Sequence, residues 1–230
     1  MEKRQQHIEA IKRIAGALGD LNSEVVFVGG AVVGLYADKP AAEDVRPTKD
    51  VDISLDITSL GQLEQLRQKL NQKGFHQSIQ DKVVCRFHYQ HIQVDVMSTE
   101  EVGWAPANKW FKPGFDFLET RDIDGTTVYL LSVAFFLASK LEAFQNRGKD
   151  PRTSHDFEDI VYVLDNLLNL SADLSQSPRL VRNYLQEQFS GMIQNPVFQE
   201  AIFAHLPYDS AQQRYENVLA ELRIFGTMGI

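Results

Sequence analysis

Two aspartates stand at alternating positions of an apolar segment, "DVDISLDI", residues 50–57. Because side chains alternate across a strand, Asp50 and Asp52 would share one face while Val51 and Ile53 point into the core. At about 3.3 Å per residue, the two Cα atoms would lie about 6.6 Å apart. An unpaired carboxylate in a half-buried strand is costly to desolvate, so we expect the two acids to have a positively charged partner. Their own strand offers no basic residue for this.

A third acid, Asp95, lies within another apolar segment, "HIQVDVM", residues 91–97. A neighbouring strand could bring it to the face that carries Asp50 and Asp52. Carboxylate oxygens suit Mg²⁺, and two ions about 3.5–4 Å apart would clamp the attacking and leaving oxygens of a phosphoryl transfer. Asp56 would lie about 13 Å from Asp52 along the strand, too far to join them. The alternative is that the acids are the polar residues of an exposed strand face.

Two glycines directly follow the apolar run "VVFV" upstream of these acids. Gly29 and Gly30 would let backbone amides and a helix N-terminus approach a phosphate without obstruction by side chains. Arg46 and Thr48, just before the acidic strand, could reach the same place from a loop. One alternative is a tight turn with no ligand. A dinucleotide site is another alternative, but the G-x-G-x-x-G spacing is not met.

The elements that would hold these residues predict an α+β fold. We expect a small mixed β-sheet with flanking helices over residues 1–128 and an α-helical domain over residues 129–230. The expected strands are "EVVFVGG" and residues 50–57, 75–79, 83–89 and 91–97, the last two forming a hairpin around a turn at Tyr89–Gln90, with one or two more between 98 and 128. The expected helices are one that ends near Gly19, residues 31–37, one between Ser59 and Gly74, and residues 132–146, 154–168, 178–190, 196–205 and 209–223.

Composition limits the classes of partner. The 230 residues carry a formal net charge of −8, so we expect no tight, sequence-independent binding of duplex DNA at physiological salt. The N-terminus lacks an apolar signal core and no apolar run approaches the about 18 residues of a membrane span, so we expect a cytoplasmic protein. The single cysteine, Cys85, excludes an internal disulfide and predicts a packed thiol.

Together these motifs resemble the polymerase-β-like nucleotidyltransferase superfamily, whose signature is a glycine pair after the first strand, then D-x-D, then a third strand carboxylate. The segment "SVAFFLASKLEAFQNRGKDPRTSHDFEDIVYVL" resembles the helical motif of the AbiEii-like abortive-infection toxins within it. The matching residues are Gly29, Gly30, Asp50, Asp52 and Asp95, then Lys140, then Arg147, Lys149 and Arg152, then Asp156 and Asp159. Ala31 departs from the pattern, because many members have Ser or Thr there.

The resemblance implies transfer of a nucleoside monophosphate from a nucleoside triphosphate to a hydroxyl of RNA, protein or a small molecule. It implies two Mg²⁺ ions and, for a toxin of a toxin–antitoxin system, an antitoxin protein as partner. The implied residues are Asp50, Asp52 and Asp95 for metal and catalysis, Lys140 and Asp156 for catalysis, and Gly29, Gly30, Thr48 and Lys140 for the nucleotide. The alternative function is a non-catalytic member that binds a nucleotide or a protein.

The helical residues also have structural interpretations. Lys140 could extend from an amphipathic helix into solvent instead of contacting phosphate. Asp156 and Asp159 share a helix face and could complement the dipole of the helix that they begin.

Overall fold

The computed structural model describes residues 2–38, 45–148 and 150–227, and the chain divides into two compact units. Unit 1 comprises Met1–Leu35 and Arg46–Ser132, and unit 2 comprises Tyr36–Val45 and Val133–Ile230. The two domains expected from the sequence, 1–128 and 129–230, stay a prediction. Lys149 lies outside the described residues.

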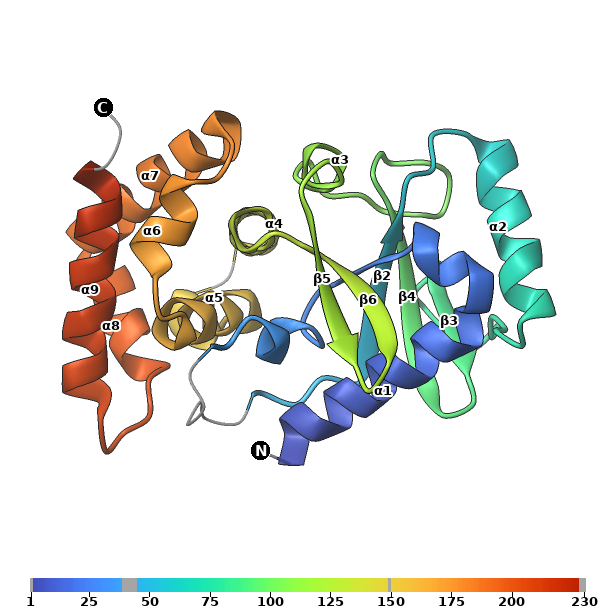
Figure 1. Ribbon diagram of the computed structural model, residues 1–230, viewed down its shortest axis with the longest axis horizontal. Helices are drawn as coiled ribbons and strands as arrows, with labels where there is room; N and C mark the ends of the chain where they lie inside the picture. Colours follow the sequence, from blue (N-terminus) through green and yellow to red (C-terminus); the bar gives the residue numbers. More distant parts are fainter. Residues whose placement is uncertain (1, 39–44, 149, 228–230) are drawn as a thin grey trace. The chain divides into compact units, whose positions relative to one another are not determined.

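In the described part of unit 1, six strands form one mixed sheet in the order β3-β4-β2-β1-β6-β5 (Figure 1). The strands are β1 (Val26–Val28), β2 (Asp50–Leu55), β3 (Arg86–Tyr89), β4 (Ile92–Ser98), β5 (Leu118–Ile123) and β6 (Thr126–Leu131). β2 runs parallel to β4, and β1 runs parallel to β6, while the other neighbours are antiparallel. The predicted α+β fold with a small mixed sheet is confirmed.

The register of the sheet brings the acidic positions to one place. β1 pairs Val28 with Asp52, and β2 pairs Asp52 with Asp95 of β4. On the other side of β4, Asp95 is opposite Arg86 of β3. Directly opposed residues of neighbouring strands have their side chains on the same face, so these charged groups are within reach of one another.

Unit 1 also contains α1 (Glu2–Leu18), η1 (Gly19–Glu24), η2 (Val33–Leu35), α2 (Leu60–Gln72) and α3 (Phe111–Gly114). α1 packs against β6 through a buried face that includes Ile11, Ile14 and Leu18 (Figure 1). α2 begins after Ser59, whose side chain accepts a hydrogen bond from the backbone N–H of Gln62. The predicted boundaries of these two helices are therefore confirmed.

Two predicted elements of unit 1 are wrong. The helix expected over residues 31–37 is only the single 3-10 turn η2, in a stretch where two valines and Gly34 have low helix propensity. The strand expected over residues 75–79 is reduced to one bridge between His76 and His88. Ile79 is fully exposed, so this segment has no buried apolar face to hold a strand in the sheet.

Unit 2 is helical, as predicted. Its helices are η3 (Pro151–Thr153), α4 (Val133–Arg147), α5 (His155–Asn166), α6 (Leu170–Ser175), α7 (Arg179–Gln194), α8 (Pro196–Ala204) and α9 (Ala211–Thr227). α6 was not predicted. The first nine residues of α4, 133–141, are all buried, which explains why this helix has a weak amphipathic pattern, and it packs against α5 and α7. Among the described residues, no helix is long and apolar enough to span a membrane.

The start of α5 depends on a buried cap. The Ser154 side chain accepts a hydrogen bond from the backbone N–H of Phe157, and Ser154 is 2% exposed. Ser154→Ala should therefore lower the free energy of unfolding by about 1 kcal/mol, as measured by urea denaturation. Ser190→Ala, which changes a side chain near the surface of α7, is the control and should stay within about 0.5 kcal/mol of wild type. Equal effects of the two substitutions would contradict a capping role.

Candidate functional site

The three strand acids and one arginine form a cluster in unit 1, here called the carboxylate cluster: Asp50, Asp52, Asp95 and Arg86. Arg86 donates from Nε to Asp95 Oδ1 at 2.7 Å and from Nη2 to Asp95 Oδ2 at 2.7 Å. Its Nη2 also donates to Asp50 Oδ2 at 3.0 Å. This arrangement is a bidentate pair with one carboxylate and a bridge to a second. Arg86 is therefore a partner that the strand of Asp50 and Asp52 could not supply.

Arg86 was missed by sequence reasoning because of the predicted hairpin turn. The turn lies at Gln90–His91, with Tyr89 paired to Ile92, and Gln90 has a φ of 54°. A turn at Tyr89–Gln90 shifts every later pairing of the hairpin by two residues. With the observed turn, counting back along both strands places Arg86 opposite Asp95. The opposition of Arg86 and Asp95 can therefore be derived from the sequence of the two strands, but only when the position of the turn between them is known.

Asp50 is held from its other side by the segment that precedes β2. Thr48 Oγ1 donates to Asp50 Oδ1 at 2.7 Å, so Thr48 does lie at the cluster. The Thr48 backbone N–H donates to Nε2 of His7 at 3.2 Å, and His7 is a buried residue of α1. Through this chain of contacts, α1 fixes the segment that orients Asp50. The role of Thr48 in binding a nucleotide stays a prediction.

The glycine pair gives the carboxylate cluster room. Gly29 has a φ of +73°, and a Cβ on it would lie 1.8 Å from Asp52 Oδ2. A Cβ on Gly30 would lie 2.4 Å from Nη2 of Arg46. Gly29 is thus required by the close approach of Asp52 and by its positive φ, whereas at Gly30 the end of the flexible Arg46 side chain could move aside. Since only the 3-10 turn η2 follows them, a phosphate here would be bound by backbone amides of the turn and not by an α-helix N-terminus.

The negative charge of the carboxylate cluster contributes to the raised pKa of the neighbouring Cys85 thiol. Burial raises the pKa of the Cys85 thiol to about 11, and the negative charges of Asp95 and Asp52 add to this shift. The hydrogen bonds from Arg86 to Asp95 raise the pKa of the Arg86 guanidinium, which therefore stays charged. The predicted packed thiol at Cys85 is confirmed by its burial. The cluster has three carboxylates and one guanidinium, so it still attracts cations.

The oxygen donors of the cluster fit Mg²⁺ chemically. This ion is usually held by one or two carboxylates together with waters and substrate phosphates. Both oxygens of Asp95 accept hydrogen bonds from Arg86, and those of Asp50 accept from Arg86 and Thr48, so a cation at these acids would compete with existing contacts. Accordingly, no set of three or more His, Cys, Asp or Glu residues converges as a metal site within the described residues. Metal binding by Asp50, Asp52 and Asp95 stays a prediction.

Lys140 forms a second cluster within unit 2. Lys140 is 7% exposed, and its Nζ lies 2.8 Å from Asp159 Oδ2 and 3.5 Å from Asp156 Oδ1. Arg147 Nη1 lies 2.5 Å from Asp156 Oδ2. The helical motif of the resemblance is therefore a buried ion-pair network, and the interpretation in which Lys140 extends into solvent is wrong. Arg152 is not in this network, because it pairs with Asp150 and Glu200.

The glycine turn gives a test of the geometry around Asp52. Gly29→Ala should lower the free energy of unfolding, because the new methyl group overlaps the Asp52 carboxylate and the residue has a positive φ. We expect a loss of more than about 1 kcal/mol in urea denaturation. Gly61→Ala is the matched control: no atom would lie within 4 Å of its Cβ, and alanine favours a helix, so stability should stay the same or rise. A stable Gly29→Ala protein would refute the close approach.

The Arg86 contacts give a second test. Arg86→Gln should lower the free energy of unfolding by about 2 kcal/mol in metal-free buffer, because Asp95 and Asp50 lose charge-assisted hydrogen bonds. Millimolar Mg²⁺ should then raise the melting temperature of Arg86→Gln more than that of wild type, because the cluster has lost the positive charge of Arg86 and attracts the cation more strongly. Arg121→Gln, which removes a more exposed pair with Glu119, is the control for loss of an arginine. Equal Mg²⁺ responses of all three proteins would show that Arg86 does not compensate a cation site.

Comparisons with known proteins identify the family and the fold of the chain. Residues 14–225 match the family described as the nucleotidyl transferase AbiEii toxin of a type IV toxin–antitoxin system. Among solved structures, an antigenic nucleotidyltransferase-like protein from Paracoccidioides brasiliensis is similar, with a TM-score of 0.53, 18% sequence identity, and coverage of 91% of this chain and 97% of that chain. That similarity shows the fold. No curated protein matches the chain. The resemblance seen in the motifs is confirmed, and the chain belongs to the AbiEii family of nucleotidyltransferase toxins.

Proposed function

We propose that this nucleotidyltransferase moves a nucleoside monophosphate from a nucleoside triphosphate to an acceptor hydroxyl in a Mg²⁺-dependent reaction. The observation that carries the proposal is the placement of Asp50 and Asp52 on one strand face, next to the turn at Gly29–Gly30 and opposite Asp95. This arrangement offers oxygen donors for a cation beside backbone amides for a phosphate.

The residues have separate roles in the proposal. Asp50 and Asp52 hold Mg²⁺, with two ions as the expected number, and the ion supplies neutralisation of charge on the phosphates. Thr48 orients the Asp50 carboxylate through its 2.7 Å hydrogen bond. The turn at Gly29–Gly30 holds the triphosphate by its backbone N–H groups. Catalysis then rests mainly on positioning and on compensation of charge during in-line attack on the α-phosphate.

Asp95 and Arg86 act as a pair in this proposal. Asp95 is the third carboxylate, and the resemblance implies that it holds metal or accepts the proton of the acceptor hydroxyl. Both of its oxygens accept hydrogen bonds from Arg86. Each carboxylate oxygen can accept more than one contact, so either role would add to or replace a hydrogen bond from Arg86 when the nucleotide binds. Arg86 is therefore a positioning residue that keeps the acids ordered without substrate.

The implied roles of Lys140 in phosphate binding and of Asp156 in catalysis remain proposals taken from the resemblance. The ammonium group of Lys140 already contacts two carboxylates, so a phosphate contact would require it to exchange partners. A structural function, in which Lys140 joins α4 to α5, is supported by the same distances. Both functions predict that the lysine is needed, and nucleotide affinity separates them.

For the partner and the acceptor we propose only the class of molecule. Membership of a toxin–antitoxin family supports an antitoxin protein as a partner. The acceptor is RNA, a protein or a small molecule, and the net charge of −8 disfavours tight binding of duplex DNA without sequence preference. We propose a cytoplasmic location, where nucleoside triphosphates are available.

A non-catalytic, nucleotide-binding or protein-binding function is the second candidate. The observation that favours it is Arg86, which places a positive charge among the acids where a catalytic member would need a metal ion. Ala31, after the glycine pair, removes a hydroxyl that many members use for phosphate. Turnover decides between the two functions.

The test is release of pyrophosphate from each of the four ribonucleoside triphosphates, with Mg²⁺ and a mixture of RNA and protein acceptors. We expect release that depends on Mg²⁺ and that falls by about 100-fold or more in Asp52→Asn, because a metal ligand is lost. Asp116→Asn, a charge change at an exposed residue outside the cluster, is the control and should keep full activity.

A measurement of binding completes this experiment. Mg²⁺ with nucleotide should raise the melting temperature of wild type and of Asp116→Asn but not of Asp52→Asn. A melting shift without pyrophosphate release would favour the non-catalytic function. Equal responses of Asp52→Asn and wild type in both assays would refute the proposed metal site.

A further inference from the structure

A positively charged side chain, Arg46, packs against the glycine turn that follows β1. Its guanidinium occupies the space in which a side chain at Gly30 would begin. A Cβ on Gly30 would lie 2.4 Å from Nη2 of Arg46, 3.2 Å from Cζ and 3.7 Å from Nη1. Both residues belong to unit 1. The end of the arginine side chain, which carries its hydrogen-bond donors, therefore lies beside the backbone of the turn.

The two glycines of the turn are approached by opposite charges. A Cβ on Gly29 would meet a carboxylate oxygen of Asp52, whereas a Cβ on Gly30 would meet the guanidinium of Arg46. A ligand at this turn would therefore find a carboxylate that attracts a divalent cation and a guanidinium that attracts an anion. A phosphate accompanied by Mg²⁺ presents both charges.

The backbone of the turn offers further donors to an anion. Gly30, Ala31 and Val32 are buried residues, and within the described part of the chain their N–H groups donate no hydrogen bond. The carbonyl oxygens of Gly30 and Val32, in contrast, accept from the N–H groups of Val33 and Leu35. Because a buried N–H group without an acceptor is costly, an acceptor supplied by a ligand would stabilise the turn.

A guanidinium at this place can compensate for a missing hydroxyl. Ala31 stands where many members of the superfamily have Ser or Thr. Arginine binds phosphate through a planar set of donors that forms two charge-assisted hydrogen bonds at once. Arg86, the other arginine near the acids, directs its donors to Asp95 and Asp50. Arg46 is therefore better placed than Arg86 for a phosphate at the turn.

The present contacts of Arg46 are compatible with this role. Its Nη1 donates a long hydrogen bond, 3.5 Å, to the carbonyl oxygen of the adjacent Pro47, and it has further interactions within the protein. A guanidinium has five N–H donors, so a phosphate can add to these contacts or replace the weakest of them.

We propose that Arg46 binds the triphosphate of the nucleotide at the Gly29–Gly30 turn. The guanidinium and the backbone N–H groups of the turn donate to phosphate oxygens, and Asp52 holds the accompanying cation. This inference rests on the proposed function, in which the turn holds the triphosphate, and it identifies the side chain that recognises the phosphates. The recognition is independent of the base of the nucleotide.

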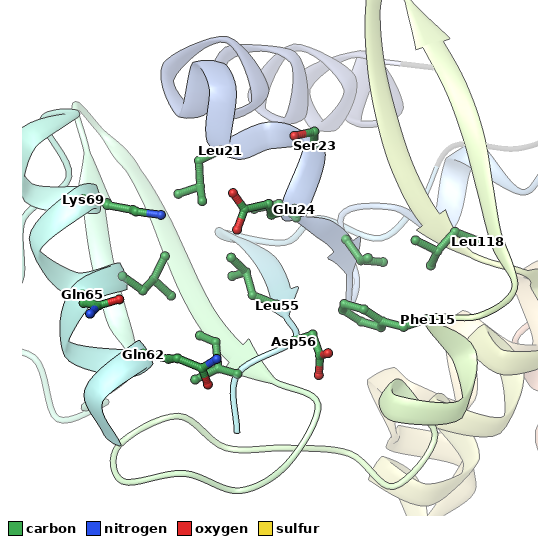
Figure 2. Close-up of a pocket in the computed structure, with 14 residues that line it drawn as sticks. Leu21, Ser23, Glu24, Leu55, Asp56, Gln62, Gln65, Lys69, Phe115 and Leu118 are labelled. Atoms are coloured by element: carbon green, nitrogen blue, oxygen red, sulfur yellow. The ribbon is translucent and has the colours of Figure 1, made fainter. Parts of the chain in front are cut away.

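A second place in unit 1 could attract a polyphosphate and must be distinguished from the turn. It is a pocket of about 480 Å³ that is lined by residues of α2 and by the start of β1, whereas the glycine turn follows the end of β1 (Figure 2). The exposed Lys69 lines this pocket, but so do the carboxylates of Glu24 and Asp56, which disfavour an anion. Lys69→Gln therefore reports on binding at the pocket.

The test uses inorganic tripolyphosphate with Mg²⁺, which presents the phosphate chain without a sugar or a base. Binding to the full-length protein is measured by calorimetry. We expect saturable binding to wild type, which Arg46→Gln weakens by about tenfold or more because charge-assisted hydrogen bonds are lost. Arg46→Lys keeps the charge but lacks the planar set of donors, so its affinity should be intermediate. Lys49→Gln, which removes a charge from an exposed residue of the same segment, is the matched control and should bind like wild type.

Two further measurements separate a phosphate contact from a structural role of Arg46. Mg²⁺ alone should raise the melting temperature of Arg46→Gln at least as much as that of wild type, since Asp50 and Asp52 are intact. In NMR spectra of wild type, the Nε–H signal of Arg46 should shift and exchange more slowly with water when tripolyphosphate and Mg²⁺ are added.

The proposal is overturned if Arg46→Gln binds tripolyphosphate as tightly as wild type, or if wild type does not bind it at millimolar concentration. An equal loss of affinity in Lys49→Gln or Lys69→Gln would also overturn it, as would a smaller melting response of Arg46→Gln to Mg²⁺. Failure of the proposed function has a different signature. In that case wild type binds tripolyphosphate through Arg46 but releases no pyrophosphate from any nucleoside triphosphate.

Discussion

The compensation of two strand carboxylates, Asp95 and Asp50, by the Arg86 guanidinium is the constraint on which unit 1 depends. Arg86 joins β3, β4 and β2 through its contacts with Asp95 and Asp50. Without a cation, these acids would repel one another at neighbouring positions of a partly buried sheet face. The glycine turn after β1 and the segment before β2 are then fitted around the same charges. The acids that would perform the chemistry are thus ordered before any substrate binds.

Most of the site could be predicted from the sequence because its elements have short, regular patterns. The alternation in "DVDISL" placed Asp50 and Asp52 on one face, and the observed register placed Asp95 opposite Asp52. Arg86 could not be assigned, because the position of a hairpin turn decides which residues are opposed, and a turn made of Tyr, Gln and His gives a weak signal. Charge compensation across strands is a property of register, which local composition does not determine.

The errors in the fold have a similar origin. One or two short strands were expected between residues 98 and 128, and β5 is one of them, but β6 runs on to Leu131, into the part expected to be helical, where it pairs with β1. α4 was predicted correctly even though it is buried on all sides of its first half, since its length and its good helix formers suffice. Tertiary burial therefore determines the secondary structure where local sequence patterns are weak, and intrinsic propensity determines it where they are strong.

The segment Tyr36–Val45 leaves unit 1 between β1 and β2 and belongs to unit 2. The ring of Tyr36 packs 4.5 Å, centroid to centroid, from that of Phe136 on α4. The chain therefore passes from one unit to the other three times: after Leu35, after Val45 and after Ser132. A single cut at Ser132 cannot yield two complete folding units, because the first fragment would keep Tyr36 and expose an aromatic ring that the second fragment needs for its core. Dissection of this protein into its two units thus requires a chain with an internal replacement as well as a truncation.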